Sequence, residues 1–223
     1  TDARWDYIQG PGLFNDAAFR TIDQALAFAN QYGVRVIFSV TGAGDMTAPL
    51  FAGAGAYAAH RGKSELDFYT DPRLREDFKD TLRYLANRTN TVTGIRYSQD
   101  KAILCWQLGN ELRLGLKADG KGDSEIAAWE SDIAAFLKSI DSNHLVMDGR
   151  ALAPLPATPD PNIDIYTQHY YGNPSTWADR LGSNVMSTKG QRPFIVGEFG
   201  PYINEPAAAE RVMAGHHRFL EAL

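Results

Sequence analysis

The feature that most constrains this fold is an apolar run at residues 102–108, AILCWQL, with Gln107 as its one polar residue. The tripeptide GNE follows it, and its last residues are Asn110 and Glu111. A run without polar alternation is typical of a strand buried on both faces of a parallel sheet. A second run, in the segment RPFIVGEFG at residues 192–200, ends in the same way at Glu198. The sequence therefore predicts two buried strands that each carry a glutamate at the carboxyl end.

The rest of the chain alternates between helical and strand patterns. Helices are expected at about residues 16–32, 72–88, 124–140, 176–188 and 206–220, strands at 34–40, 103–108, 145–147, 163–169 and 194–196, and loops at 1–14 and 41–59. Repeated strand–loop–helix order predicts an α/β protein with a parallel sheet and helices outside, either a (β/α)₈ TIM barrel or a doubly wound sheet. The candidate functional residues follow several different strands, and this favours the barrel.

The pattern shows about five strands, whereas a (β/α)₈ barrel has eight. The chain opens in a loop that leads to a helix, and it stops in a helix. We therefore expect residues 1–223 to form a single catalytic barrel domain that is incomplete, lacking about two strands at the front and one at the back. Such a domain would leave unpaired strand edges.

Composition argues against several classes of partner and cofactor. The net charge of −5 comes with no basic block, so neither nucleic acid nor an anionic membrane is expected to bind. No run of about 18 apolar residues is present, as a membrane span would require. Cys105 is the single cysteine, which excludes an internal disulfide, and no histidine pair has metal-ligand spacing. We expect a monomer with no metal and no cofactor.

Two carboxyl groups at the ends of buried strands are the arrangement that a glycosidase needs. In retaining enzymes a protonated carboxyl group donates its proton to the leaving oxygen. An ionised carboxylate, about 5–5.5 Å away, attacks the anomeric carbon. Burial and the neighbouring negative charge keep the first group protonated. A single strand-end glutamate is better explained as a helix cap or a surface ion pair. Two matching strand ends favour Glu111 and Glu198 as a catalytic pair.

A third predicted strand ends in the segment YTQHYY at residues 166–171. In an extended segment His169 and Tyr171 lie on the same face, so both side chains could point into the site. The tyrosine hydroxyl could donate to a nucleophilic carboxylate and keep it ionised. Taken alone, His169 is better explained as a hydrogen-bonded structural histidine.

Tryptophans are candidates for binding sugars, because the apolar faces of pyranoses stack on aromatic rings. Trp5 and Trp177 lie in or near predicted loops and are the better candidates for such platforms. Trp129 lies in a helical pattern and Trp106 in a strand, so both are expected in the interior.

The motifs WQLGNEL and VGEFG resemble those of the clan A glycoside hydrolases, and the chain is most similar to glycoside hydrolase family 5. The segments DFYTDP (67–72), RTNTVTG (88–94) and SIDSNHLV (139–146) resemble the β-mannanase branch of that family. The resemblance covers nearly the whole chain. It implies a secreted endo-acting enzyme, extracellular or periplasmic, that hydrolyses a plant-type polysaccharide or its oligosaccharides, above all β-1,4-mannan.

The resemblance also implies a role for each matching residue. Glu111 would be the general acid/base and Glu198 the nucleophile of a retaining double displacement. Asn110 would bind the sugar 2-hydroxyl, His169 would line the cleavage site, and Tyr171 would orient the nucleophile.

The sequence departs from the family pattern at two positions near the glutamates. Leu112 stands where a proline often follows the acid/base, and Gly197 replaces a bulkier residue before the nucleophile. Two alternatives stay open: a β-1,4-glucanase or other family 5 β-glycosidase, and a non-catalytic carbohydrate-binding barrel.

Overall fold

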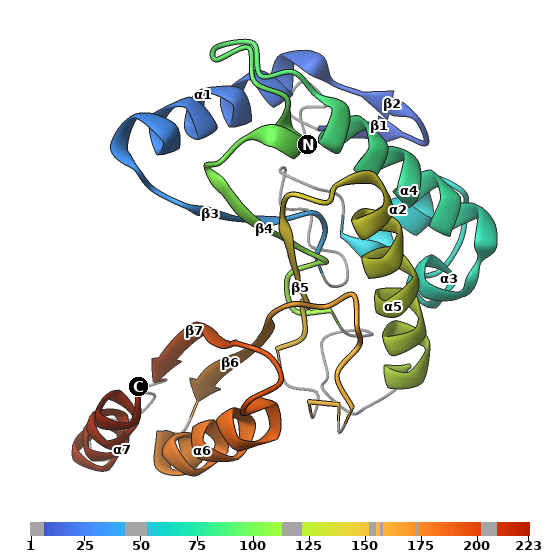
Figure 1. The fold of residues 1–223 in the computed structure, drawn as a ribbon. Coiled ribbons are helices and arrows are strands. Elements are labelled where there is room, and N and C mark those ends of the chain that lie inside the picture. The colour runs from blue at the N-terminus through green and yellow to red at the C-terminus, as the bar shows by residue number, and fades with distance from the viewer. Residues whose placement is uncertain are drawn as a thin grey trace.

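The structure is a computed structural model that describes residues 7–42, 53–112, 122–151, 155–156, 158–172, 174–201 and 209–223 (Figure 1). Its strands are β1 (Ile8–Gly10), β2 (Leu13–Phe14), β3 (Val36–Ser39), β4 (Ile103–Gln107), β5 (Leu145–Met147), β6 (Tyr166–Gly172) and β7 (Phe194–Pro201). Its α-helices are α1 (Asp16–Tyr32), α2 (Ala54–Ala59), α3 (Glu65–Thr70), α4 (Pro72–Asn87), α5 (Asp123–Ile140), α6 (Trp177–Thr188) and α7 (Ala209–Ala222), with 3₁₀ turns at Tyr97–Gln99 and Pro174–Thr176. In these ranges no helix combines the length and apolar character that crossing a membrane requires.

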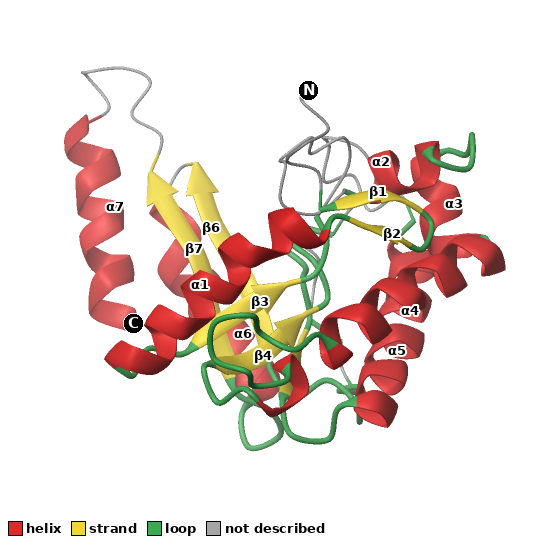
Figure 2. Ribbon diagram, turned by 90° about the horizontal axis from the view of Figure 1, so that it is seen from above, coloured by secondary structure: helices red, strands yellow, loops and turns green. Residues whose placement is uncertain are grey.

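Five parallel strands follow one another in chain order. Strands β3, β4 and β5 pair in parallel, and β6 and β7 form a second parallel pair. A parallel bridge between Met147 and Ile165 joins the two groups. Helices α4 and α5 lie on one side of β3–β5, while α6 and α7 lie beside β6 and β7 (Figures 1 and 2). This is the predicted α/β class, five strands of a (β/α) barrel that does not close within the described residues.

The predicted helix boundaries are confirmed where capping residues set them. Asn15 accepts the Ala18 amide at the start of α1, and Gly33 ends that helix in the left-handed region with φ of 69°. Helix α4 begins at Pro72 after Asp71, whose side chain accepts the Arg73 amide. These side-chain acceptors replace backbone partners that the first helical turn lacks.

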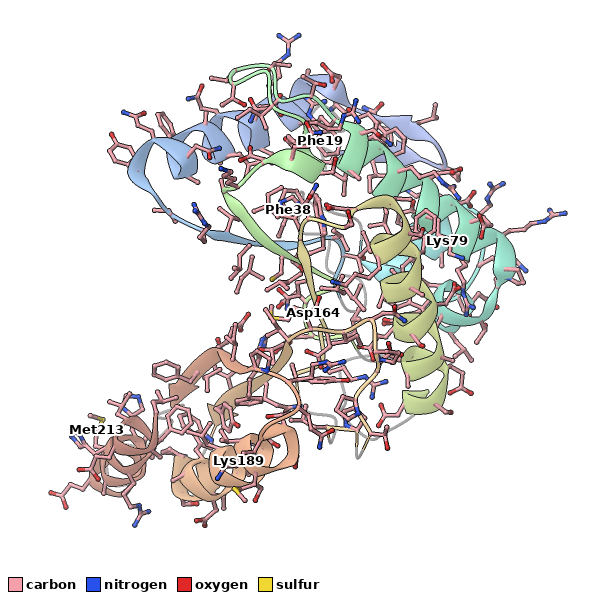
Figure 3. The ribbon with its side chains drawn as sticks, viewed as in Figure 1. Phe19, Phe38, Lys79, Asp164, Lys189 and Met213 are labelled. Carbon is pink, nitrogen blue, oxygen red and sulfur yellow. The ribbon has the colours of Figure 1, made fainter. Side chains whose placement is uncertain are left out.

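The helical layer is held by a cluster of buried aromatic rings. Tyr57, Phe68, Phe78 and Trp129 come from α2, α3, α4 and α5, and their ring centroids lie 5.2–5.7 Å apart. Trp129 is fully buried, as predicted from its helical pattern, and Trp106 on β4 is buried as well. Phe19 of α1 and Phe38 of β3 belong to the same buried core (Figure 3).

Two predicted loops contain short elements that the sequence pattern did not reveal. Residues 8–14 form the antiparallel hairpin β1–β2 around Gly12, rather than a loop. Residues 54–59, expected within the loop 41–59, form helix α2. Both elements are shorter than the window over which apolar periodicity can be recognised. Residues 1–6 and 43–52 lie outside the described ranges.

The two last strands differ from their predicted bounds. β6 begins and ends three residues later than the expected 163–169, and β7 extends to Pro201 instead of ending at residue 196. The ladder continues because backbone pairing does not need apolar side chains. The polar residues His169, Tyr171 and Glu198 therefore lie within paired strands rather than in loops.

The mannanase-like segment at residues 88–94 has a structural role. Arg88 forms two hydrogen bonds with the carboxylate of Asp23 on α1, at 2.9 and 2.7 Å, and both side chains are buried. Thr91 and Tyr97 also donate to Asp23. Burial alone would raise the pKa of Asp23, but these donors hold it below its usual value. The segment thereby ties α1 to α4.

A second buried network surrounds His144, just before β5. Nδ1 lies 2.6 Å from Asp141 Oδ2, and Nε2 lies 3.0 Å from the Asp100 carbonyl. Trp106 Nε1 donates to the same Asp141 oxygen at 2.8 Å. Both ring nitrogens of His144 face acceptors, so the doubly protonated cation satisfies both. Burial opposes that charge, but the hydrogen bonds to Asp141 and Asp100 raise the pKa of His144 above 6.5.

This network predicts a pH-dependent part of the stability. The raised pKa makes the contribution of His144 complete below its unfolded-state pKa, and the contribution is lost as pH rises through the folded-state pKa. We expect His144→Gln to cost about 1.5–3 kcal/mol at low pH, the range for a hydrogen bond to a charged group, and less above neutrality. Urea unfolding of the parent and the variant across pH 5–9 measures the difference. The exposed His60→Gln is the control, and a pH-independent difference for His144→Gln would contradict the prediction.

Candidate active site

The carboxyl end of β4 is held between its two neighbouring strands. Asn110 N donates to Thr41 O after β3 at 2.8 Å, and Leu112 N donates to Gly149 O after β5 at 2.9 Å. Between them, Glu111 has a φ of 55°, the one positive value at a non-glycine residue in the described ranges. Such a conformation costs free energy and persists only where the surroundings impose it, and this happens mostly at functional sites.

Strands β6 and β7 bring the second carboxylate to the same edge. Their register pairs His169 with Glu198. His169 and Tyr171 lie on one face of β6, as predicted, and the Tyr171 hydroxyl donates to Glu198 Oε2 at 2.9 Å. This hydrogen bond fixes the orientation of the Glu198 carboxylate.

The structure brings the two predicted glutamates together across a small gap. His169 Nδ1 lies 3.0 Å from Glu111 Oε1 and 3.5 Å from Glu198 Oε2. One oxygen of each glutamate and one His169 nitrogen all lie within 4.8 Å of one another. The Glu111 side chain is 15% exposed and that of Glu198 is 38% exposed. Both acids are therefore partly open to a substrate, and Glu111 is the more buried of the two.

Among the residues that the structure describes, these three side chains are also close enough together to hold a metal ion. Each offers one ligand atom, and both carboxylates would then be occupied by the ion. No proton transfer from Glu111 would be possible in that state. The expectation of a metal-free site stays a prediction.

Gly197 fits the site because a side chain there would strike the residues beneath it. A Cβ at this position would lie 2.6 Å from Thr167 Oγ1 and 2.8 Å from His169 Nε2. The bulkier family residue therefore has no room here unless His169 moves.

The remaining predicted site residues have different outcomes. Asn110 lies at the end of β4, where its backbone bridges to Gly42, and its neighbour Glu111 faces His169. Trp177 is 1% exposed, and its ring packs 5.3 Å from that of Phe219, so its prediction as a sugar platform is wrong. Trp177 opens the amphipathic helix α6 with its side chain on the buried face. Trp5 lies outside the described residues.

The sequence reasoning missed the residues after β5 that contact the site. Gly149 and Ala151 accept hydrogen bonds from the backbone of Leu112 and His169. Gly149 approaches so closely that a Cβ would lie 1.9 Å from Gly109 O. A glycine two residues after a predicted strand is the one local signal of such close approach.

Parallel strands with outer helices and two facing glutamates at the carboxyl edge define the class of the (β/α)-barrel glycoside hydrolases. Residues 35–180, more than half of the chain, match the family described as GH family 5 beta-mannosidase-like. The chain therefore belongs to glycoside hydrolase family 5.

Curated relatives and solved structures agree with this family. Mannan endo-1,4-beta-mannosidase 7 of Arabidopsis thaliana is 29% identical over an alignment of 237 positions. The alignment covers 88% of this chain and 53% of the relative. Mannan endo-1,4-beta-mannosidase 4 of Solanum lycopersicum is 34% identical, covering 62% of this chain and 35% of the relative. The hyperthermostable endo-1,4-beta-D-mannanase of Thermotoga petrophila superposes with a TM-score of 0.80 at 22% identity, covering 98% of this chain and 71% of that one. The chain thus spans about half or less of these curated relatives, and the structural likeness shows the shared barrel fold.

The tight fit at Gly197 gives a testable prediction. Gly197→Ala should displace His169 and lower glycoside hydrolysis by the intact enzyme about 10²-fold, as expected when a reacting group moves by about 1 Å. Gly182→Ala on α6 is the matched control, because a Cβ there meets no atom within 4 Å. The rates of both variants on one glycan substrate test this, and equal rates would contradict the steric argument.

Proposed function

We propose that this protein is a retaining endo-β-glycosidase that hydrolyses β-1,4-mannan. The observation that carries the proposal is the approach of Glu111 and Glu198, whose oxygens lie within 4.8 Å of one another beside His169. Carboxyl groups about 5–5.5 Å apart are typical of retention, whereas inversion needs about 6.5–9.5 Å to admit a water molecule. The names of the curated relatives, mannan endo-1,4-beta-mannosidases, support mannan as the substrate.

The geometry supports a specific assignment of the two steps. Glu198 Oε attacks the anomeric carbon while the glycosidic bond breaks, and Glu111 gives its proton to the departing oxygen. Glu111, now ionised, then takes a proton from water, and that water oxygen displaces Glu198 from the sugar. Each displacement inverts the configuration of the anomeric carbon, so the two together retain it.

The neighbouring residues support these roles. The Tyr171 hydroxyl, 2.9 Å from Glu198 Oε2, holds the nucleophile in one orientation. His169 Nδ1 touches both acids and orients the acid/base. In this proposal Asn110, next to Glu111, binds the 2-hydroxyl of the sugar at the cleavage site.

We also propose that the enzyme works outside the cytoplasm and as a monomer. A polymeric plant-type glycan cannot cross a membrane to reach an internal enzyme. Fractionation of cells that produce the intact protein tests its location. Size-exclusion chromatography of the purified protein tests the monomeric state.

Replacing either glutamate tests the catalytic roles. Glu111→Ala and Glu198→Ala should each lower mannan hydrolysis by the intact enzyme by about 10²–10⁴-fold or more. Azide should restore turnover of Glu198→Ala and give the opposite anomer, because the small anion replaces the lost nucleophile. Exposed Glu221→Ala is the control. Near-parental activity of either active-site variant would show that the roles are wrong.

The choice of substrate separates the remaining alternatives. The intact enzyme should release reducing sugar from β-1,4-mannan and little from carboxymethyl cellulose, as measured by a reducing-end assay. The reverse preference would favour a β-1,4-glucanase. Binding of mannan with no turnover would favour a non-catalytic carbohydrate-binding barrel, since fold alone does not guarantee chemistry.

A further inference from the structure

The four residues after β5, 148–151, contact both halves of the active site. Gly149 O accepts Leu112 N at 2.9 Å, next to Glu111, and Ala151 O accepts His169 N at 3.0 Å. Asp148 Oδ1 accepts the Thr167 amide at 2.8 Å, two residues before His169. This short segment therefore sets the backbone position of the general acid/base and of the histidine between the two acids.

The segment itself is tied to helix α5 by one arginine. Arg150 Nε donates to Glu130 Oε2 at 2.8 Å, and Arg150 Nη2 donates to the Asp123 carbonyl at 2.9 Å. The side chains of Arg150 and Glu130 are 12% and 7% exposed. Two donors in a fixed planar geometry hold both the position and the direction of the segment.

Displacement of the segment has to reach the site because there is no free space between them. A Cβ on Gly149 would lie 1.9 Å from Gly109 O, so the two backbones are already in contact. On its other side, Arg150 and Glu130 border a cavity of about 220 Å³ that Asp148 and Tyr166 also line. Side chains do not fill the space on the cavity side of residues 148–151. There the hydrogen bonds between Arg150 and Glu130 hold the segment in place.

We propose that Arg150 and Glu130 are a positioning pair for the active site, which act through residues 148–151 on Glu111 and His169. The inference rests on the proposed function, because it gives these two residues their chemical roles. The side chains gathered at the site are Glu111, His169 and Glu198, whereas Arg150 bonds Glu130 and the Asp123 carbonyl. The pair fixes geometry and takes no part in proton transfer.

A second ion pair on the same helix offers a matched control. Lys138, near the other end of α5, bonds Asp164, which in turn accepts the Val146 amide at 2.8 Å. Asp164 lies near the middle of the molecule (Figure 3). This pair also joins α5 to β5, through the Val146 amide and not through a hydrogen bond to residues 148–151.

Amide hydrogen exchange measures the restraint directly and does not depend on activity. In Arg150→Met, the Leu112 and His169 amides should exchange at least about tenfold faster, while the Cys105 and Trp106 amides in β4 keep their protection. In Lys138→Met, the Leu112 and His169 amides should keep parental rates. Equal acceleration at all four amides in Arg150→Met, or none, would overturn the proposal.

A double variant separates positioning from stability. Arg150→Met alone leaves the Glu130 carboxylate buried without its partner, whereas Arg150→Met with Glu130→Leu removes both charges. The double variant should unfold near the parental midpoint and still show fast exchange at Leu112 and His169. If it regained parental exchange rates at both amides, the pair would be only structural and the proposal would fail.

Steady-state kinetics of the intact enzyme complete the test. Arg150→Met with Glu130→Leu should lower kcat on mannan about tenfold or more with little change in KM, because misplaced acid and histidine affect the chemical step. Arg150→Lys, which keeps one of the two donors, should lie between. Parental kcat in the double variant would overturn the proposal. A parent that lacks all glycosidase activity would instead refute the proposed function, while the exchange experiment would still decide whether the pair restrains residues 148–151.

Discussion

The parallel backbone ladder is the constraint on which the site depends. It sets His169 opposite Glu198 on β6 and β7, and it places Glu111 beside Thr41 and Gly149 at the end of β4. Because neighbouring parallel strands end on one edge of the sheet, acids from distant parts of the chain meet there. The apolar side chains bury the strands in the core, and the backbone hydrogen bonds of the ladder fix the direction and register of the strands.

The fold class and the two glutamates could be predicted because their signals are local. An apolar run identifies a buried strand, and the residue that follows the run is at its carboxyl end. The bounds of β6 could not be predicted, since its second half is paired through its backbone although its side chains are polar. Trp177 was assigned wrongly because nearness to a loop says nothing about which side of a helix an indole occupies.

The parts of the site that the sequence did not reveal depend on contacts between distant segments. Apart from Gly149 itself, nothing in residues 148–151 indicates that this segment accepts the amide of Leu112, after β4, and the amide of His169 on β6. The absence of a side chain at Gly197 is visible in the sequence, but its reason is not, because Thr167 and His169 lie on another strand. Such contacts follow from register and strand spacing, which only the three-dimensional structure fixes.

The left-handed backbone at Glu111 has a consequence for how this protein changes over generations. An L-residue in that region gives up about 1–2 kcal/mol, whereas glycine does not, and asparagine adopts the region more readily than most other residues. Selection for stability alone would therefore replace Glu111 by glycine, at the loss of the acid to which we assign the proton transfer. A barrel that keeps a glutamate in this backbone conformation is less stable to heat than one with glycine there.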